Sequence, residues 1–129
     1  MDLIKRAAEN LKNAYAPYSH FYVSCAVVGN TGKVYVGCNV ENACINAGTC
    51  AERVAIAQAI SLGEKKITQI AIINASERPC PPCGNCLQFI NEFAAPEVEI
   101  FSANKDQTKT QKYTLQELLP HTYDRSYLP

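Results

Sequence analysis

The spacing of apolar residues in the first third of the chain predicts a helix followed by a β-hairpin. Apolar residues recur at helical spacing over residues 3–15, with charged side chains on the other faces, and we expect this helix to end before Pro17. Residues 21–28 and 33–38 have the apolar content and alternation of strands. The segment 29–32 between them has the chemistry of a turn, so the two strands are predicted to pair as a hairpin.

The rest of the chain alternates helices and strands. The helix predicted for residues 50–62 is apolar nearly all round and ends at Gly63, so we expect it to be buried. Residues 103–114 are predicted to form a polar turn. The other predicted elements are a buried strand at 67–73, a loop rich in proline and cysteine at 74–85, a helix at 86–94, a strand at 98–102 and a short helix at 115–119. This order predicts a mixed sheet with helices on both faces.

Composition narrows the classes of function. The chain has 129 residues, 47% of them apolar, which suits one domain spanning 1–129 with a real core. Lysine plus arginine and aspartate plus glutamate both number 12, so no basic stripe is expected and a nucleic-acid polymer is a disfavoured partner. No apolar run approaches the roughly 18 residues of a membrane span. The first residues lack the order of a signal peptide, and we therefore expect a cytoplasmic protein without a membrane partner.

Cysteine is the residue type that points to chemistry. Clustered cysteines in a cytoplasmic chain indicate metal binding or catalysis, and an odd number fits poorly with a fully paired disulfide framework. The last three cysteines repeat at every third position. The seven are Cys25, Cys38, Cys44, Cys50, Cys80, Cys83 and Cys86.

Two of these cysteines are predicted to lie in the first turns of helices. Thr49 is the expected N-cap of the helix that contains Cys50, and Glu52 has the spacing that completes a capping box. Asn85 is the expected cap of the helix that contains Cys86. The positive end of a helix dipole favours a thiolate, so this arrangement suits a bound Zn²⁺. From spacing alone, a helix cap and an acid/base role are equally good interpretations of Glu52.

The number of cysteine ligands would decide what kind of zinc site this is. Three cysteines leave a tetrahedral zinc one open position, which is typical of a catalytic site, whereas a fourth ligand from Cys80 would close the site. The sequence Pro-Cys-x-x-Cys occurs twice, at 79–83 and 82–86. We favour the second, because only there does glycine follow the first cysteine and a predicted helix begin at the second. A redox role for Cys80 and Cys83 is a weaker alternative.

Several segments resemble the cytidine deaminase family. Cys50–Arg53 together with Pro82–Cys86 resembles the zinc signature of these enzymes. Tyr18–Phe21 and Gly37–Ala43 are similar to the nucleoside-binding part of the family, and Leu115–Pro120 is similar to its C-terminal helix. The match runs through nearly the whole chain in the expected order.

The resemblance implies a three-layer α/β/α fold around a mixed five-stranded sheet and the zinc-dependent conversion of cytidine and deoxycytidine to uridine and deoxyuridine, with release of ammonia, in pyrimidine salvage. It implies that Cys50, Cys83 and Cys86 hold Zn²⁺ and that Glu52 carries protons between water and the pyrimidine. It further implies that Arg53 lies near the sulfur of Cys50 and withdraws negative charge from the metal.

For the nucleoside, the resemblance implies that Phe21 packs on the pyrimidine and that Asn39 and Glu41 bind ribose hydroxyls. It also places Ala51 among the substrate-binding residues. Small members of the family are homotetramers in which a C-terminal aromatic reaches a neighbouring subunit's site, and Tyr123 occupies that place here. The expected partners are thus a small nucleoside and three further copies of the chain.

Departures from the family pattern leave two alternatives. Ser24 and Cys25 stand where glycine and alanine are usual, Ile45 replaces a frequent aromatic, Leu87 replaces a common arginine and Cys80 is extra. One alternative is a deaminase of a modified cytosine nucleoside such as blasticidin S. The other is a non-catalytic module in which four cysteines close the zinc site.

Overall fold

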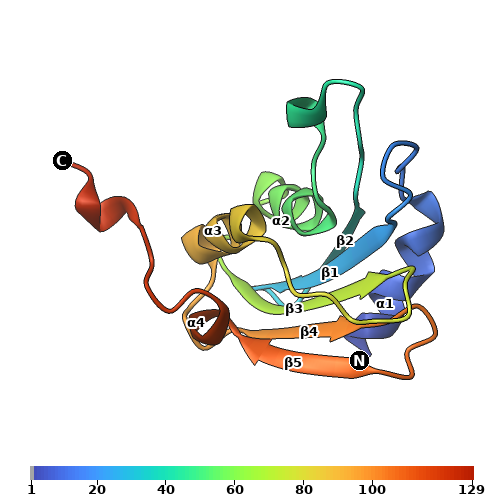
Figure 1. The fold of residues 1–129 in the computed structure, drawn as a ribbon. Coiled ribbons are helices and arrows are strands. Elements are labelled where there is room, and N and C mark those ends of the chain that lie inside the picture. The colour runs from blue at the N-terminus through green and yellow to red at the C-terminus, as the bar shows by residue number, and fades with distance from the viewer. Residues whose placement is uncertain (1) are drawn as a thin grey trace.

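A five-stranded mixed sheet forms the centre of the computed structural model, which describes residues 2–129 (Figure 1). Met1, the first residue of the expected 1–129 domain, lies outside the described residues. The strand order is β2-β1-β3-β4-β5; β3 and β4 are parallel and the other neighbours are antiparallel. The strands are β1 (Val23–Gly29), β2 (Val34–Cys38), β3 (Ile67–Asn74), β4 (Glu99–Ala103) and β5 (Thr110–Thr114). The predicted hairpin and the predicted mixed sheet are confirmed.

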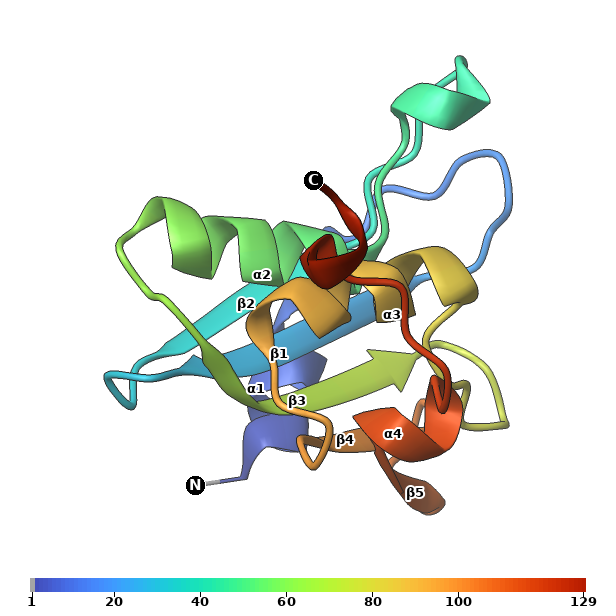
Figure 2. The same ribbon diagram turned by 90° about the vertical axis from the view of Figure 1, so that its left-hand side faces the viewer.

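Helices cover both faces of this sheet, so the fold has three layers. Figures 1 and 2 show α2 and α3 side by side over one face and α1 on the opposite face. The helices are α1 (Leu3–Asn10), α2 (Ala51–Ser61), α3 (Gly84–Phe93) and the short α4 (Leu115–Leu118). The three-layer α/β/α prediction is therefore confirmed. Within residues 2–129, every helix is too short or too polar to cross a membrane.

The strands feed two cores because successive side chains point to opposite faces of a sheet. Cys25 and Val27 of β1 are buried with the residues beneath α2 and α3, while Ala26 between them is buried with α1. In β3, Ile72 joins the first core and Ala71 the second. The burial of β3 on both faces matches the central strand that its apolar sequence predicts.

The first helix is shorter than the predicted 3–15. It ends at Asn10 and is followed by a short 3₁₀ turn, Leu11–Asn13. Beyond that turn the backbone of Tyr15 leaves the helical path, since its N–H donates to the carbonyl of Asn39 at 2.9 Å and its carbonyl accepts from the N–H of Glu41 at 2.9 Å. A backbone pairing between distant segments thus replaces the last predicted helical turn.

The polar turn predicted for 103–114 is wrong in its second half, because residues 110–114 form β5. The strand pairs antiparallel with β4 from Ala103↔Thr110 to Glu99↔Thr114. Its side chains are mostly exposed, as expected at the edge of a sheet, so no apolar alternation reveals it. The backbone ladder with β4 makes this strand.

A glycine allows α2 to approach β2 closely. A Cβ at Gly37 would lie 2.6 Å from the backbone nitrogen of Ala55 and 2.8 Å from Cγ1 of Val54. Both distances are too short for carbon contacts, and the backbone of Ala55 cannot rotate away. Gly37 therefore sets the distance between the sheet and the helix that begins beside Cys50.

We expect Gly37→Ala to destabilise the fold by about 1–3 kcal/mol, the usual cost of overpacking a core. Urea unfolding followed by circular dichroism measures the change. Gly84→Ala is the matched control, because a Cβ there meets no atom within 4 Å. Equal losses in the two variants would show that the approach of α2 to β2 does not explain the effect.

A buried glutamate joins the end of α2 to the β1–β2 hairpin. The Glu64 carboxylate accepts hydrogen bonds from the Thr31 N–H at 3.0 Å, from the Tyr35 hydroxyl at 2.7 Å and from the Thr31 hydroxyl. These bonds, led by the one from the Thr31 hydroxyl, lower the pKa of Glu64. The side chain is only 3% exposed, so the bonds hold the hairpin against the chain that follows α2.

Because the folded-state pKa of Glu64 lies below its unfolded value of about 4.3, ionised Glu64 stabilises the fold above that value and loses the effect as the pH falls through the folded pKa. We expect Glu64→Gln to lower stability at pH 7 and to flatten its decline between about pH 5 and pH 3. Urea midpoints measured across this range test it. The other carboxylates titrate in both proteins, so an unchanged pH dependence in the variant would contradict the assignment.

Candidate active site

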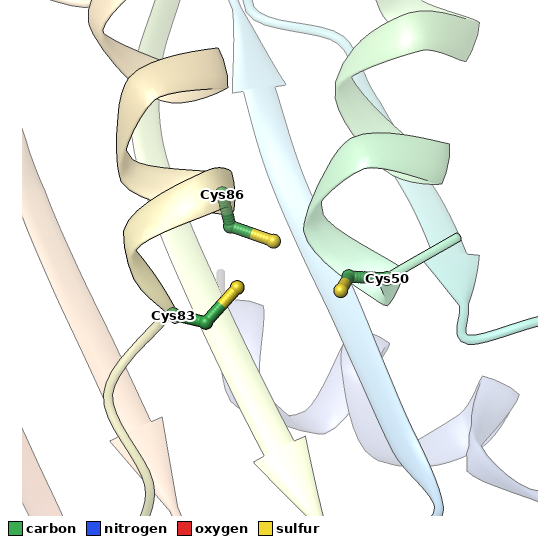
Figure 3. Close-up of side chains that lie close together, drawn as sticks. All are labelled: Cys50, Cys83 and Cys86. Atoms are coloured by element: carbon green, nitrogen blue, oxygen red, sulfur yellow. The ribbon is translucent and has the colours of Figure 1, made fainter. Parts of the chain in front are cut away.

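Three cysteine sulfurs converge where two helices begin. The Sγ atoms of Cys50, Cys83 and Cys86 all lie within 4.8 Å of one another (Figure 3). Cys50 immediately precedes α2, Cys83 immediately precedes α3, and Cys86 lies in the first turn of α3. Zinc–sulfur bonds of about 2.3 Å at tetrahedral angles separate ligand sulfurs by about 3.8 Å. The donor set and its spacing therefore fit one Zn²⁺.

The two helices are not capped as predicted. Cys50 and Cys83 occupy the N-cap positions themselves, and neither helix has a side-chain cap. The predicted caps Thr49 and Asn85 are wrong. For Thr49 the reason is a backbone pairing with Val40, in which each residue's N–H donates to the other's carbonyl at 2.9–3.0 Å. Both helix N-termini consequently meet at the sulfur cluster, where their dipoles favour thiolates.

The sulfurs act on one another's ionisation. The pKa of Cys50 is lowered to about 6, chiefly by the hydrogen bond with the Cys86 thiol and also by Cys83 and the charge of Arg53, against the opposing effect of burial. The same bond with Cys50, together with burial and the charge of Glu52, raises the pKa of Cys86. The two thiols thus shift each other's pKa in opposite directions, and a divalent cation bound among the sulfurs would favour the thiolate form of both.

Glu52 lies in the first turn of α2 and is only 6% exposed. Burial raises its pKa to about 7, and the negative charge of Cys50 contributes in the same direction. The capping box with Thr49 does not form, because Cys50 is the N-cap residue. Glu52 is therefore a buried carboxyl beside the sulfur cluster that is able to accept or donate a proton near neutral pH.

A cavity of about 750 Å³ brings the predicted site residues together. It has the size of a small-molecule site. Its lining combines groups for a metal and an acid/base with aromatic and polar groups for a ligand. Of the predicted residues, those on its wall are Phe21, Asn39, Glu41, Cys50, Ala51, Glu52, Arg53 and Cys83. Cys86 lies buried in α3 behind this wall.

The backbone of residues 18–23, at and before the start of β1, holds the polar side chains Asn39 and Glu41 of the cavity. Asn39 accepts from the Val23 N–H at 3.0 Å and donates from Nδ2 to the Phe21 carbonyl at 2.7 Å, which leaves one amide hydrogen for a ligand. Glu41 accepts from the backbone N–H groups of residues 18 and 19 at 3.0 Å each, and from the Ser19 hydroxyl. These bonds, with the hydroxyl first, lower the pKa of Glu41.

The sequence did not predict the contact between Ser19 and Glu41. Ser19 lies in the Tyr18–Phe21 motif, but the motif alone does not show that its hydroxyl reaches Glu41, 22 residues away. Arg53 interacts with both of the helices that meet at the sulfur cluster. Its guanidinium carbon lies 5.7 Å from the centre of the Phe89 ring, and its charge lowers the pKa of Cys50.

Cys80, the possible fourth zinc ligand, and Tyr123, the expected contact to a neighbouring subunit, both lie outside the sulfur cluster. Cys80 lines the cavity, but its backbone is fixed to Ser102 by bonds of 3.0 and 2.7 Å, and within residues 2–129 only three cysteines have metal-binding spacing. Tyr123 is 56% exposed, stacks on Tyr127 at 5.9 Å and is absent from the cavity wall. Within one chain, Tyr123 therefore has no contact with this site.

The other departures from the family pattern have separate places. Ser24 and Cys25 are fully buried in β1, where the Ser24 hydroxyl donates to the Gly37 carbonyl at 3.3 Å. Leu87 is buried in the core beneath α3. Ile45, like Cys80, lines the cavity, and its side chain is 76% exposed.

Comparisons with known proteins agree with this geometry. Residues 1–102 match the family model described as the cytidine and deoxycytidylate deaminase zinc-binding region. A cytidine deaminase of Halalkalibacterium halodurans is 38% identical over 94% of this chain and 91% of the relative, and one of Mycoplasma genitalium is 32% identical over 96% and 95%.

Solved structures extend the agreement to the fold. The crystal structure of a cytidine deaminase from Burkholderia pseudomallei is 38% identical, with a TM-score of 0.88 over 94% of this chain and 96% of that one. A cytidine deaminase from Mycobacterium tuberculosis is 30% identical, with a TM-score of 0.81 over 95% and 94%. The chain, with its cluster of three cysteines, therefore belongs to the cytidine and deoxycytidylate deaminase family and is a zinc-dependent hydrolase.

Proposed function

We propose that the chain converts cytidine and deoxycytidine, with water, to uridine and deoxyuridine and ammonia. The observation that carries the proposal is the buried carboxyl of Glu52 beside a three-thiol cluster on the wall of a nucleoside-sized cavity. The relatives that match nearly the whole chain are cytidine deaminases. The product is a nucleoside that remains usable for nucleotide synthesis, so the proposed context is pyrimidine salvage.

Cys50, Cys83 and Cys86 would hold zinc, which when bound through three thiolates supplies a Lewis acid with an open position for activating water. Glu52 takes a proton from the attacking water and gives it to N3 of the pyrimidine. It then moves the second proton to the amino group, which leaves as ammonia while oxygen remains at C4. The charge of Arg53 offsets part of the negative charge of the thiolates.

The remaining wall residues are proposed to hold the nucleoside. Phe21 packs on the pyrimidine, Ala51 lies beside Glu52 on the wall, and Asn39 and Glu41 bind the sugar. Asn39 has one free amide hydrogen, and Glu41 accepts three hydrogen bonds where a carboxylate offers about four acceptor positions. The free amide hydrogen of Asn39 and the remaining acceptor position of Glu41 can together bind one hydroxyl group, which both accepts and donates a hydrogen bond. Ribose and deoxyribose share the 3′ hydroxyl, which is why the proposal includes both nucleosides.

A second substrate class is supported by a neighbouring hollow of about 440 Å³, which shares Phe21, Cys80 and Pro81 with the main cavity and adds Arg78. A group attached to the nucleoside would have room there. A modified cytosine nucleoside of the blasticidin S kind is therefore the alternative substrate.

We also propose that the chain acts as a homotetramer of single domains. The 3₁₀ segment Ile45–Ala47 projects from the body (Figure 1), and exposed Ile45 lines the cavity, so a neighbouring copy that covers Ile45 would close the site. The exposed Tyr123 is proposed to reach such a neighbour. The seven free cysteines fit the reducing cytoplasm, which we propose as the location.

The first test is Glu52→Gln, which keeps the shape of the side chain and removes the titratable oxygen. We expect turnover of cytidine, followed by ultraviolet absorbance, to fall by about 10³-fold or more, with zinc content near one per chain and an unchanged unfolding midpoint. Glu9→Gln, at an exposed position of α1, is the control and should keep full activity. Normal turnover in Glu52→Gln would refute the acid/base role.

Zinc content tests the ligand set. Cys50→Ser, Cys83→Ser and Cys86→Ser should each lose most of the bound zinc, because each removes one of three thiolates. Cys80→Ser should retain zinc near one per chain. Elemental analysis of the purified proteins gives the answer directly, and zinc loss in Cys80→Ser would mean that four cysteines close the site.

A further inference from the structure

The carboxylate of Glu41 is fixed at both oxygens. Oε1 accepts from the backbone N–H groups of Tyr18 and Ser19 at 3.0 Å each, and Oε2 accepts from the Ser19 hydroxyl. The ion pairs found within the described residues 2–129 join Lys105 to Glu77 and Lys112 to Glu99, so Glu41 takes part in neither. Ser19 therefore contributes two of the three hydrogen bonds that decide which way this carboxylate faces.

Ser19 is itself held in place by the turn around it. Its Oγ accepts from the Phe21 N–H at 3.0 Å, so its proton remains available for Glu41. The next residue, His20, has a left-handed backbone with φ of 58°, and its N–H donates to the Ala16 carbonyl at 3.0 Å. A left-handed residue other than glycine needs such support from its surroundings. The turn thus presents the hydroxyl in one direction.

The same turn places Phe21 beside Glu41 on the cavity wall. The Ser19 Oγ accepts from the Phe21 N–H and donates to the Glu41 carboxylate, while Asn39 donates to the Phe21 carbonyl. Asn39 still holds the Phe21 carbonyl when the Ser19 hydroxyl is removed, whereas Oε2 of Glu41 then loses its hydrogen bond. Glu41 and Asn39 are tied in turn to the backbone of Tyr15, which fixes their positions along the chain.

We propose that Ser19 is a positioning residue that orients the Glu41 carboxylate and so makes the enzyme selective for cytosine nucleosides that carry sugar hydroxyls. The inference rests on the proposed function. Two acceptor positions of Glu41 face backbone donors and a third faces Ser19, so the remaining one is directed at the ligand. Without the hydroxyl of Ser19, Oε2 loses its anchor and the carboxylate can rotate away from that direction.

Kinetics with two substrates test this role. Ser19→Ala should raise KM for cytidine about tenfold, the effect of one charged hydrogen bond, and change kcat less than about twofold. For 2′,3′-dideoxycytidine, which lacks the sugar hydroxyls, we expect kcat/KM to change less than about twofold. Ser19→Thr keeps a hydroxyl and should return KM to within about threefold of the wild type. Glu41→Gln combined with Ser19→Ala should lose little more than Glu41→Gln alone.

Ser126→Ala is the matched control, because the Ser126 hydroxyl also donates to a carboxylate, that of Asp124, and Ser126 is absent from the cavity wall. It should leave both substrates unchanged. Equal losses for cytidine and dideoxycytidine in Ser19→Ala would indicate a general structural role and overturn the proposal. Unchanged KM for both substrates would overturn it as well.

A readout without turnover follows the Glu41 carboxyl by carbon-13 NMR as the pH is varied. The Ser19 hydroxyl lowers the pKa of Glu41, so Ser19→Ala should raise it, whereas Ser19→Thr should not. A wild-type protein that converts neither nucleoside would overturn the proposed function. A Glu41 titration that Ser19→Ala leaves unchanged, in a protein that does convert cytidine, would overturn the positioning role alone.

Discussion

The structure depends on the meeting of three cysteine thiols at the N-termini of two helices. Sulfurs within 4.8 Å cannot all ionise without a cation, because like charges so close repel strongly. Three thiolates and one Zn²⁺ carry a net charge of −1, which the positive ends of α2 and α3 and the charge of Arg53 offset. The zinc site and the packing of α2 beside α3 are therefore one arrangement, stabilised together.

The contacts that fix the position of α2 also place Cys50 and Glu52 on the cavity wall. Gly37 lets the helix lie close to β2, and the backbone pairing of Val40 with Thr49 fixes where the helix starts. Because Cys50 occupies the N-cap position, Glu52 has no helix end to cap and its carboxyl is available to the cavity. The burial that raises its pKa to about 7 is a direct result of this packing.

The surroundings of the two carboxylates of the cavity shift their pKa values in opposite directions. Glu52 is buried beside the negative charge of Cys50, which favours the protonated form and suits proton transfer. Glu41 accepts hydrogen bonds from Ser19 and its neighbour, which favour the charged form and suit the binding of a hydroxyl. Residue type alone does not distinguish them, whereas hydrogen-bond donors and burial do.

The sequence by itself determined the family, the order of most elements and the three cysteines whose sulfurs meet, because apolar periodicity and cysteine spacing are local properties. Only the tertiary structure decided the end of the first helix, the place where the second helix begins and the strand at 110–114, since each depends on backbone groups contributed by a distant segment. The Ser19–Glu41 contact belongs to the same class: its two residues lie 22 positions apart, and only the folded chain brings them together.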